Sequence, residues 1–350
     1  MPMKNRIKEQ DDNFYNTLLI ALKEMFDKDI EKARYDTKQL HGGTLGDVKL
    51  VYGTLITKTG ETLEYKVVYK NQKKWKRYSD DNSWRREYDL YKSDLGNEFT
   101  NNFRWPICYY TNISKNELQI WMEYIDGITG DSLTVDMCEA AARALGRFQG
   151  KLFAEKPKAL DKIRNLSNVG FLRQNYLNYR SWPEVYDYIR SDDCDLPKHI
   201  CEMMIEIDEN EERVWREIGK LPIVLCQRDF WNANIFYTEN QIICIDWDTT
   251  GWGRLGEDIA SLIADVEDSG NIVECFKRCV PAYLSGFSEY HRVDNISRAT
   301  IYHLIIVMFG YRYIENYKFA KTDQDKKLSR DILKKLFNIR VELTKQQKML

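Results

Sequence analysis

Several features that would place this 350-residue chain in a specialised class are missing from it. No apolar run approaches the length of a membrane span, and the first residues lack the apolar core of a signal peptide. The four histidines and eight cysteines are scattered, without a Cys-x-x-Cys pair or any zinc-like cluster. The sequence therefore favours a cytoplasmic protein with reduced, mostly buried thiols, and argues against a disulfide framework or a histidine-based metal site.

An excess of charge of either sign is also missing. The chain has 52 basic and 54 acidic residues, a formal net charge of -2 and a pI near 6.2. This balance offers no general attraction to nucleic acid or to an anionic membrane. Hydrophobic residues at 43% and charged residues at 30% are typical of a globular protein, and the length favours two lobes. We expect a monomer or weak dimer that binds small molecules.

The first third of the chain is rich in strand patterns. Apolar residues at helical spacing predict a leading helix over residues ~10 to ~35. The segment "VKLVYGTLITKTGETLEYKVVYK" then predicts a hairpin with its turn at Lys-Thr-Gly-Glu. A short helix is expected in "SWRREYDLY", and two more strands in "FRWPICYYTNISKNELQIWMEYIDG".

From about Leu133 the pattern becomes helical and stays so, apart from one strand-like segment near residues 223–246. The C-terminal segment carries an apolar stripe and a lysine-rich face, typical of an amphipathic packing helix. We therefore predict an α+β protein of two lobes, with the boundary near Asp126. Residues 1–126 form a small β-rich N-terminal lobe, and residues 127–350 form a larger, mainly helical C-terminal lobe.

Lys70 is the basic residue best placed to contact phosphate groups. It ends the apolar strand "VVYK", whereas the alternative Lys66 lies on the same strand face but within the strand. An amine in a cleft needs a carboxylate partner, and Glu87 on the following predicted helix can provide one. Upstream, Gly42, Gly43 and Gly46 are either a phosphate-binding loop or part of an ordinary hairpin.

The stretch "CQRDFWNANIFYTENQIICIDWD" contains the densest set of candidate catalytic groups. Asp229 and Asn234 are separated by a short loop, and a predicted hairpin then delivers Asp246. Phosphoryl transfer needs an aligned hydroxyl and metal ions that neutralise the phosphates. A carboxylate can accept the hydroxyl proton, and a few hard oxygen ligands suit Mg²⁺. The sequence thus predicts Asp229 as the catalytic group, and Asn234 and Asp246 as metal ligands.

The motif pair "QRDFWNAN…IDWD" resembles the catalytic loop and metal-binding motif of the aminoglycoside phosphotransferase and choline kinase superfamily. The resemblance covers roughly residues 40 to 265. It implies the two-lobed protein-kinase-like fold, Mg²⁺ as cofactor, and ATP or GTP as co-substrate. It further implies that Gly43, Gly46 and Lys70, held by Glu87, contact the nucleotide phosphates, and that the backbone of Glu123, Tyr124 and Ile125 holds the base. Asp258 would support the catalytic loop.

This sequence departs from the family at one point. The family commonly has His-Gly-Asp where this chain has Gln227, Arg228 and Asp229, and the sequence does not say what the first two residues do. Cys226 and Trp231 are interpreted as packing residues, Trp231 also bordering the acceptor.

The favoured function is a small-molecule kinase that phosphorylates a hydroxyl of an amine- or sugar-bearing acceptor. The alternatives are a nucleotide-binding pseudokinase or partner-binding regulator, and a protein kinase. Only 12 positions separate Asp246 from Asp258, which leaves no room for a peptide-docking activation segment. The resemblance alone suggests antibiotic resistance or self-protection. The nucleotide and the acceptor are left open.

Two sets of side chains are candidates for acceptor binding. The simpler interpretation is that the acidic set lies in solvated loops and that the aromatic set belongs to the core. The acidic set could bind ammonium groups, and the aromatic set could stack on a sugar or enclose a quaternary amine. The acidic set comprises Asp192, Asp193, Asp195, Asp265, Glu267, Asp268 and Glu289, and the aromatic set comprises Tyr176, Tyr179, Trp182, Tyr186, Tyr311 and Tyr313.

Overall fold

A computed structural model of the chain describes residues 3–40, 46–75, 80–180, 183–239, 241–264, 271–292 and 296–347. The chain divides into two compact units. Unit 1 comprises Met1–Gly96 and Trp105–Asp126, and unit 2 comprises Asn97–Arg104 and Gly127–Leu350. No helix in the described part of the chain has both the length and the apolar character needed to cross a membrane.

Unit 1 is built on an antiparallel sheet of five strands in the order β1-β2-β3-β6-β5. Its elements are α1 (Met3–Phe26), β1 (Ile30–Gln39), β2 (Gly46–Thr57), β3 (Thr62–Lys73), α2 (Ser83–Tyr91), β5 (Cys108–Ile113) and β6 (Glu117–Glu123). The predicted hairpin and the two later strands are confirmed. The predicted α+β class with two compact units, one built on a sheet and one mainly helical, is also confirmed.

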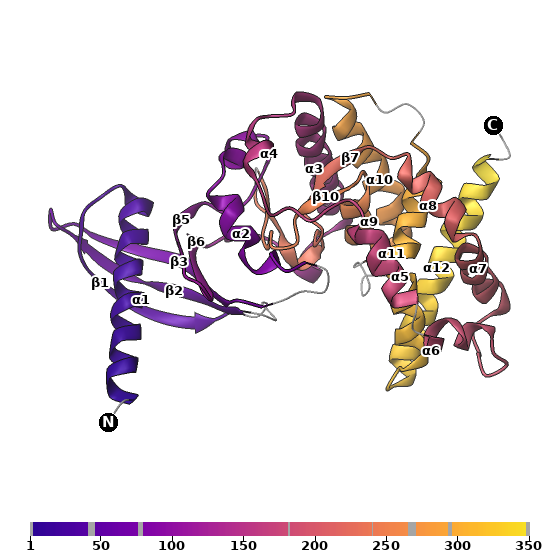
Figure 1. Cartoon of the computed structure of the whole chain (residues 1–350), viewed down its shortest axis with the longest axis horizontal. Helices are drawn as coiled ribbons and strands as arrows, with labels where there is room; N and C mark the ends of the chain where they lie inside the picture. The colour runs from indigo at the N-terminus through magenta and orange to yellow at the C-terminus, as the bar shows by residue number, and fades with distance from the viewer. Residues whose placement is uncertain are drawn as a thin grey trace. The chain divides into compact units, whose positions relative to one another are not determined.

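Helix α1 lies across one face of this sheet (Figure 1). Its Leu18 and Leu22 join a buried cluster with Val67 and Tyr69 of β3 and Trp121 of β6. A second cluster joins α2 to the sheet and contains Trp84, Leu118, Ile120 and Met122. Because side chains alternate along a strand, odd-numbered residues of β3 face α1 and even-numbered ones belong to the α2 side.

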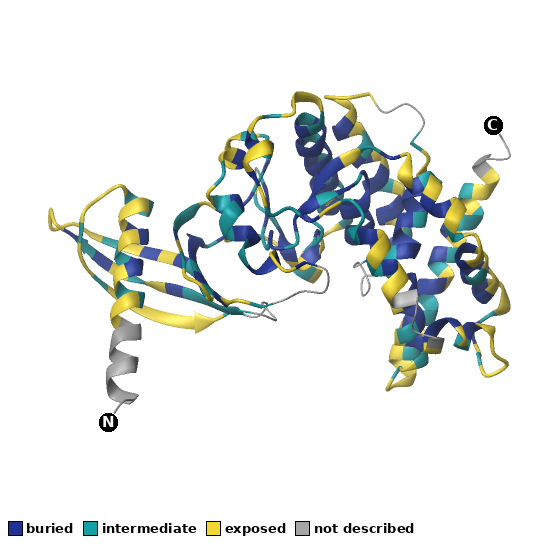
Figure 2. Ribbon diagram, viewed as in Figure 1, coloured by how far each residue is buried: buried dark blue, intermediate teal, exposed yellow. Residues whose placement is uncertain are grey.

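The leading helix is shorter than the sequence predicted. It ends at Phe26, and residues 30–39 form the edge strand β1. This strand pairs with β2 on one side, and eight of its ten residues are exposed (Figure 2). An exposed edge strand does not need alternating apolar residues, so the pattern that identifies half-buried strands is missing here. The expected helix beyond residue 26 was wrong for that reason.

Unit 2 is mainly helical. Its longer helices are α3 (Val135–Glu155), α5 (Phe171–Arg180), α7 (Lys198–Glu209), α8 (Glu211–Gly219), α9 (Glu257–Ala264), α10 (Ile272–Ser288), α11 (Arg298–Lys318) and α12 (Asp323–Gln347). Short turns of helix are α4 (Ala159–Lys162), α6 (Pro183–Tyr186), η2 (Gly130–Ser132), η3 (Tyr188–Arg190) and η4 (Asn232–Asn234). Another, η1 (Asp94–Glu98), spans the division between the units.

Two small sheets interrupt these helices. The hairpin β8 (Ile235–Tyr237) and β9 (Ile242–Cys244) is extended by β4 (Phe103–Arg104), which runs parallel to β9. Strand β7 (Ile223–Cys226) pairs with β10 (Gly251–Arg254). The predicted hairpin before Asp246 is therefore present. All eight cysteines are free thiols and six of them are buried, as the sequence predicted.

Helices α3 and α10 are packed through their backbones. A Cβ atom added to Gly146 would lie 2.2 Å from the carbonyl oxygen of Tyr283, and one added to Gly286 would lie 2.3 Å from that of Arg143. Neither distance is sterically possible, so glycine is required at both positions for this crossing. The close contact fixes the two helices against each other at the centre of unit 2.

Candidate active site

The described site residues predicted from the sequence fall into two groups, one in each unit. In unit 1, Lys70 lies near the end of β3 and is buried, at 9% exposure. Its Nζ is 2.7 Å from a carboxylate oxygen of Glu87, which is itself buried on α2. Two buried opposite charges are tolerated only as a close pair. The predicted ion pair is confirmed, whereas its contact with phosphate stays a prediction.

Lys66 has a different environment from Lys70. It is exposed, and its Nζ lies over the ring of Tyr124 at 5.7 Å from the centroid. Both lysines are even-numbered residues of one strand, so alternation alone did not distinguish them. The position of α2 distinguishes them, because Glu87 on this helix pairs with Lys70, which lies nearer the end of the strand.

A second buried ion pair, which the sequence interpretation missed, anchors α2. The guanidinium of Arg86 donates to both carboxylate oxygens of Asp80, at 2.8 and 2.6 Å. The side chains are only 1% and 6% exposed. A bidentate pair of this kind fixes orientation as well as distance. Because Arg86 precedes Glu87 on the helix, the pair also fixes where Glu87 points.

The other nucleotide-binding candidates of unit 1 are less defined. Gly43 lies outside the described residues. Gly46 begins β2 opposite Gln72, where an added Cβ would lie 3.1 Å from the carbonyl oxygen of Asn71. That close approach is a reason for glycine within the sheet itself, so the hairpin interpretation accounts for Gly46 without a ligand.

The segment predicted to hold the base follows β6. The Glu123 N–H donates to the carbonyl oxygen of Ile107 at 2.8 Å, and its carboxylate accepts from the Ile107 N–H at 2.9 Å. The donor of Glu123 is therefore used within unit 1 and is not offered to a base. Tyr124 is half-buried and Ile125 is buried, and their role stays a prediction.

In unit 2, Asp229 and Asn234 are joined directly. Asp229 lies in the loop between β7 and η4, and Asn234 ends η4. The Asn234 side-chain nitrogen donates to the backbone oxygen of Asp229 at 2.9 Å and to its Oδ2 at 2.8 Å. These bonds set the orientation of both side chains, and they direct the amide nitrogen of Asn234, not its oxygen, toward Asp229.

Gln227 connects this loop to Asp246. Its side-chain nitrogen donates to the carbonyl oxygens of Ile245 (3.0 Å) and Asp246 (2.7 Å), and its side-chain oxygen accepts from the Asp229 N–H (2.7 Å). The residue is 1% exposed, and Asp246 has a left-handed backbone with φ 58°. One amide thus holds the backbones of both candidate residues. Its donor and acceptor ends are both required, which explains glutamine here.

Asp258 supports the same loop from the first turn of α9. Its carboxylate accepts from the backbone N–H groups of Gln227 (3.0 Å) and Arg228 (2.8 Å) and from the side-chain nitrogen of Gln149 (2.8 Å). Burial raises the pKa of this carboxyl to about 6, while the three donors favour its ionised form. The predicted support is confirmed. Gln149, on α3, gave no signal in the sequence.

Two neighbours of the catalytic loop were given packing roles. Cys226 is completely buried, and burial raises the pKa of its thiol well above the ordinary value, so its packing role is confirmed. Trp231 is 37% exposed, so its predicted packing role is wrong. The core position is taken by Phe230, at 0% exposure, because adjacent residues of an extended loop point in different directions.

Most candidates for acceptor binding are engaged elsewhere in unit 2. The rings of Tyr176, Tyr186, Tyr311 and Tyr313 are buried, which favours the core interpretation. Glu289 pairs with Arg147 on α3. The exposed residues Asp192 and Asp193 remain candidates. Asp265, Glu267, Asp268 and Trp182 lie outside the described residues, as does the side chain of Tyr179.

Asp195 has its own structural role. Its carboxylate accepts hydrogen bonds from the hydroxyls of Tyr188 (3.1 Å) and Tyr317 (2.9 Å) and pairs with Lys326 at 2.7 Å. The bonds, with the one from Lys326 foremost, lower its pKa to about 2. The residue ties the loop before α7 to α11 and α12.

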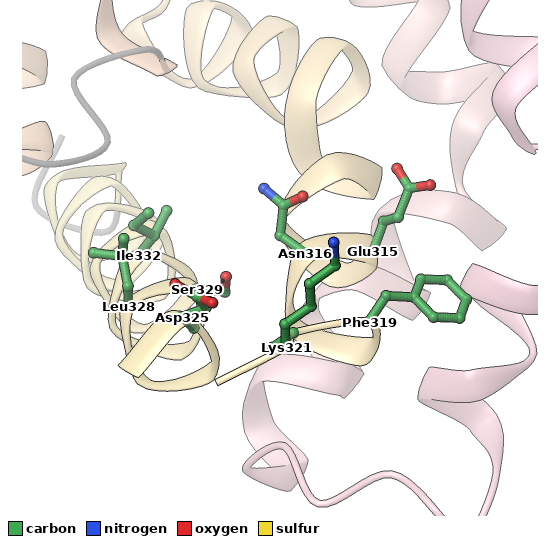
Figure 3. Close-up of a pocket in the computed structure, with 9 residues that line it drawn as sticks. Glu315, Asn316, Phe319, Lys321, Asp325, Leu328, Ser329 and Ile332 are labelled. Atoms are coloured by element: carbon green, nitrogen blue, oxygen red, sulfur yellow. Dashed lines mark hydrogen bonds between the residues drawn. The ribbon is translucent and has the colours of Figure 1, made fainter. Parts of the chain in front are cut away.

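A hollow of about 450 Å³ lies between the end of α11 and the start of α12 (Figure 3). Glu315 and Asn316 of α11 border it with Phe319, which directly follows that helix, and Asp325 and Leu328 border it from α12. None of the predicted catalytic or metal-binding residues lines it. We assign it no role in the chemistry.

Comparison with known proteins identifies the family and the fold. Residues 107–294, more than half of the chain, match the phosphotransferase enzyme family. No curated protein sequence matches the chain. Among solved structures, a choline kinase from Cryptosporidium parvum Iowa II superposes with a TM-score of 0.54 at 15% identity, covering 89% of this chain and 91% of its own.

Two further structures are similar over comparable lengths. A microcompartment-associated aminopropanol kinase has a TM-score of 0.55 at 13% identity, covering 91% of this chain and 95% of its own. The GDP complex of aminoglycoside 2'-phosphotransferase-IIIa has a TM-score of 0.54 at 13% identity, covering 94% and 98%. At these identities the similarity shows a shared fold.

Proposed function

The chain belongs to the phosphotransferase enzyme family, and from this premise we propose that it transfers the γ-phosphoryl group of ATP or GTP to a hydroxyl of a small, amine-bearing molecule. One observation carries the proposal. Gln227 and Asn234 hydrogen-bond to Asp229, and Gln227 also binds the backbone at Asp246, so the three oxygen-bearing candidates form one ordered cluster. Phosphoryl transfer depends on such preorganised groups more than on covalent chemistry.

Each proposed role follows from the local chemistry. Asp229 accepts the proton of the acceptor hydroxyl, and the bonds from Asn234 hold its carboxylate in one orientation. Lys70, oriented by Glu87, contacts the α- and β-phosphates. Backbone atoms of Tyr124 and Ile125 hold the base.

The donor set fits Mg²⁺. The Asn234 amide nitrogen is engaged by Asp229, which leaves its amide oxygen as the ligating end, and Asp246 supplies a carboxylate. The described residues contain no group of three or more His, Cys, Asp or Glu side chains able to hold a metal ion. Mg²⁺ commonly takes one or two protein ligands and completes its shell with phosphate and water. When bound, the ion would neutralise charge on the phosphates.

The acceptor class is proposed from the similar structures and from the local charge. The similar enzymes are named for choline, aminopropanol and aminoglycosides, which all combine an amine with a hydroxyl. The exposed carboxylates of Asp192 and Asp193, which remain candidates for acceptor binding, also suit a cationic acceptor. An aminoglycoside acceptor would make the biological role antibiotic resistance.

Nucleoside diphosphate release tests the proposal. Purified enzyme with Mg²⁺ and ATP or GTP is supplied with choline, aminopropanol or kanamycin, and acceptor-dependent release is expected for at least one pair. Asp229→Asn should lower kcat by about 10²- to 10⁴-fold, the range for losing a general base. Asp161→Asn, an exposed aspartate of unit 2, is the matched control and should not change the rate.

The alternative to an enzyme is a nucleotide-binding regulator. If the wild-type chain binds nucleotide but releases diphosphate no faster than Asp229→Asn with every acceptor, that alternative is correct and the proposed reaction is not.

A further inference from the structure

Arg228 has a backbone conformation that its side chain does not favour. Its φ is 68°, in the left-handed region, where a residue with a Cβ atom is disfavoured and glycine is not. The related His-Gly-Asp motif has glycine at this position. An arginine here needs compensating contacts, and its guanidinium makes an unusual number of them.

The guanidinium of Arg228 binds two separate segments of unit 2. It donates from Nη1 to the hydroxyl of Ser167 (2.6 Å) and from Nη2 to the carbonyl oxygens of Asn168 (3.0 Å) and Trp252 (2.5 Å). It also lies over the ring of Phe171, 4.9 Å from the centroid. The side chain is only 5% exposed. The fork geometry of arginine serves several acceptors at once, which lysine could not do.

A buried carboxylate balances this charge. Glu257, in the first turn of α9, lies 3.6 Å from Nε of Arg228, and its side chain is 3% exposed. Glu257 also accepts from the backbone N–H of Arg254 at 2.6 Å. Within the described residues the buried Nε of Arg228 makes no hydrogen bond, so the Glu257 contact at 3.6 Å is an electrostatic one, and the hydrogen bonds of the guanidinium are those of Nη1 and Nη2.

These contacts join the catalytic loop to the segment that precedes α5. Ser167 is also joined to residues 250–252. The Trp252 N–H donates to the Ser167 carbonyl oxygen at 2.9 Å, and the N–H and hydroxyl of Ser167 donate to the carbonyl oxygen of Thr250 at 3.5 and 3.4 Å. The approach is so close that a Cβ on Gly251 would lie 1.9 Å from the Ser167 hydroxyl oxygen. Arg228 adds two hydrogen bonds and the contact with the Phe171 ring to this attachment, and it is the side chain that joins the segment to the catalytic loop.

We propose that Arg228 is a positioning residue that fixes residues 167–171 beside Asp229, and that these residues form one wall of the acceptor site. The inference rests on the proposed function, in which the acceptor hydroxyl lies within hydrogen-bonding reach of Asp229. An acceptor larger than a few atoms extends from that point onto neighbouring elements. Residues 167–171 are such an element, because one side chain connects them to the residue next to Asp229.

The proposal predicts different effects on acceptor binding and on nucleotide binding. Arg228 belongs to unit 2, whereas Lys70, Tyr124 and Ile125, to which the nucleotide contacts are assigned, belong to unit 1, so we expect the loss of Arg228 to weaken acceptor binding selectively. In Arg228→Met, we expect the acceptor KM to rise and kcat to fall by about ten- to a hundredfold, the cost of misplacing a reacting group by about 1 Å. The nucleotide KM should stay within about twofold. Arg173→Met is the matched control, since Arg173 lies on α5 in an exposed pair with Glu212.

Chemical rescue distinguishes a missing guanidinium from general damage. Arg228→Gly removes the side chain and also relieves the left-handed backbone. Millimolar guanidinium chloride should restore the acceptor KM of this variant, because the ion can occupy the space between Ser167, Phe171 and Glu257. Urea, which has a similar shape without the charge, should not restore it. Sodium chloride at equal concentration controls for ionic strength.

Amide hydrogen exchange gives a readout that does not require turnover. The Trp252 amide, bonded to Ser167, should exchange about tenfold faster in Arg228→Gly and recover with guanidinium. Equal changes in both KM values, or exchange identical to Arg173→Met, would overturn the proposal. If no acceptor supports turnover in the wild-type enzyme, the proposed function fails, and the exchange result alone still decides whether Arg228 holds this segment.

Discussion

Variants of the Lys70–Glu87 pair should change the unfolding free energy and the nucleotide affinity independently. At 2.7 Å and an effective dielectric constant near 20, the attraction between the two charges is about 6 kcal/mol before desolvation is subtracted. Removing one partner leaves the other charge buried and alone, which costs about 3–5 kcal/mol in unfolding free energy. Glu87→Gln keeps a neutral hydrogen-bond acceptor for the lysine, so we expect about 3 kcal/mol.

Replacing both partners should reverse the stability loss without restoring function. In the double variant Lys70→Met, Glu87→Leu, no charge is left unpaired, and the unfolding free energy should return to within about 1 kcal/mol of the wild-type value. Nucleotide affinity should stay low, because the amine that contacts phosphate is gone. Losing a charged hydrogen bond worth about 1.5–3 kcal/mol corresponds to a ten- to hundredfold rise in Kd.

Two measurements on the same protein samples test this reasoning. Urea denaturation gives the unfolding free energies, and titration with a fluorescent nucleotide analogue gives Kd for the wild type, both single variants and the double variant. Lys66→Met is the matched control, since Lys66 lies on the same strand but is exposed over Tyr124. The assignment of Lys70 is refuted if Lys66→Met weakens binding as much as Lys70→Met. It is also refuted if the double variant regains affinity together with stability.

Three further predictions concern individual side chains. Arg86→Met should lower the unfolding free energy by about 3–5 kcal/mol because it leaves the buried Asp80 unpaired. Arg85→Met, in a partly exposed i,i+4 pair with Asp89, should cost about 1 kcal/mol or less in the same urea experiment. Asp258→Asn should reduce kcat by about tenfold or more in the diphosphate-release assay, because two backbone N–H groups of the catalytic loop and the Gln149 side chain lose their carboxylate partner. Burial, foremost, lowers the pKa of His303 from 6.5 to about 4, so the stability it contributes is present above pH 6.5 and is lost as the pH falls toward 4. Between pH 7 and 5 the loss should approach about 2 kcal/mol, and His303→Gln should remove it.

Each of these predictions has a clear contrary result. Equal effects of the two arginine variants would mean that burial does not decide the cost of the pair. A normal kcat in Asp258→Asn would show that the loop is held without this carboxylate. An unchanged pH dependence in His303→Gln would assign the acid sensitivity to other groups.

The sequence predicted the strands that have one face buried in a core and the other face exposed. Strands β2, β3, β5 and β6 each carry apolar residues that reach a core, so alternation and turn residues identified them. Strand β1 is exposed over nearly its whole length and gave no such pattern. Its existence depends on backbone pairing with β2, which is a tertiary property and leaves little trace in composition.

The site shows the same division. The sequence proposes Asp229, Asn234 and Asp246 from their side-chain chemistry and their spacing, and their roles stay predictions; in the structure Asn234 is hydrogen-bonded to Asp229. The groups that orient them could not be predicted, because a buried glutamine has no distinctive neighbours in sequence: Gln149 lies 109 positions from its partner Asp258. Arg228 was visible as a departure from the family motif, yet its partners become apparent only when residues 167–171 are seen beside β10.

The glycine-mediated crossing of α3 and α10 has a consequence for how this enzyme can evolve. Gln149 lies between Gly146 and Gly150 on α3 and accepts a hydrogen bond from Tyr283 of α10, so its reach toward Asp258 depends on how closely the two helices approach. A methyl group at the crossing would push the helices apart and be felt at the catalytic loop without any change in that loop's own residues. Substitutions at the glycines of this crossing could therefore inactivate the enzyme, although they lie outside the sequence motifs of the site. A lineage could lose activity in this way while it retains every proposed catalytic side chain.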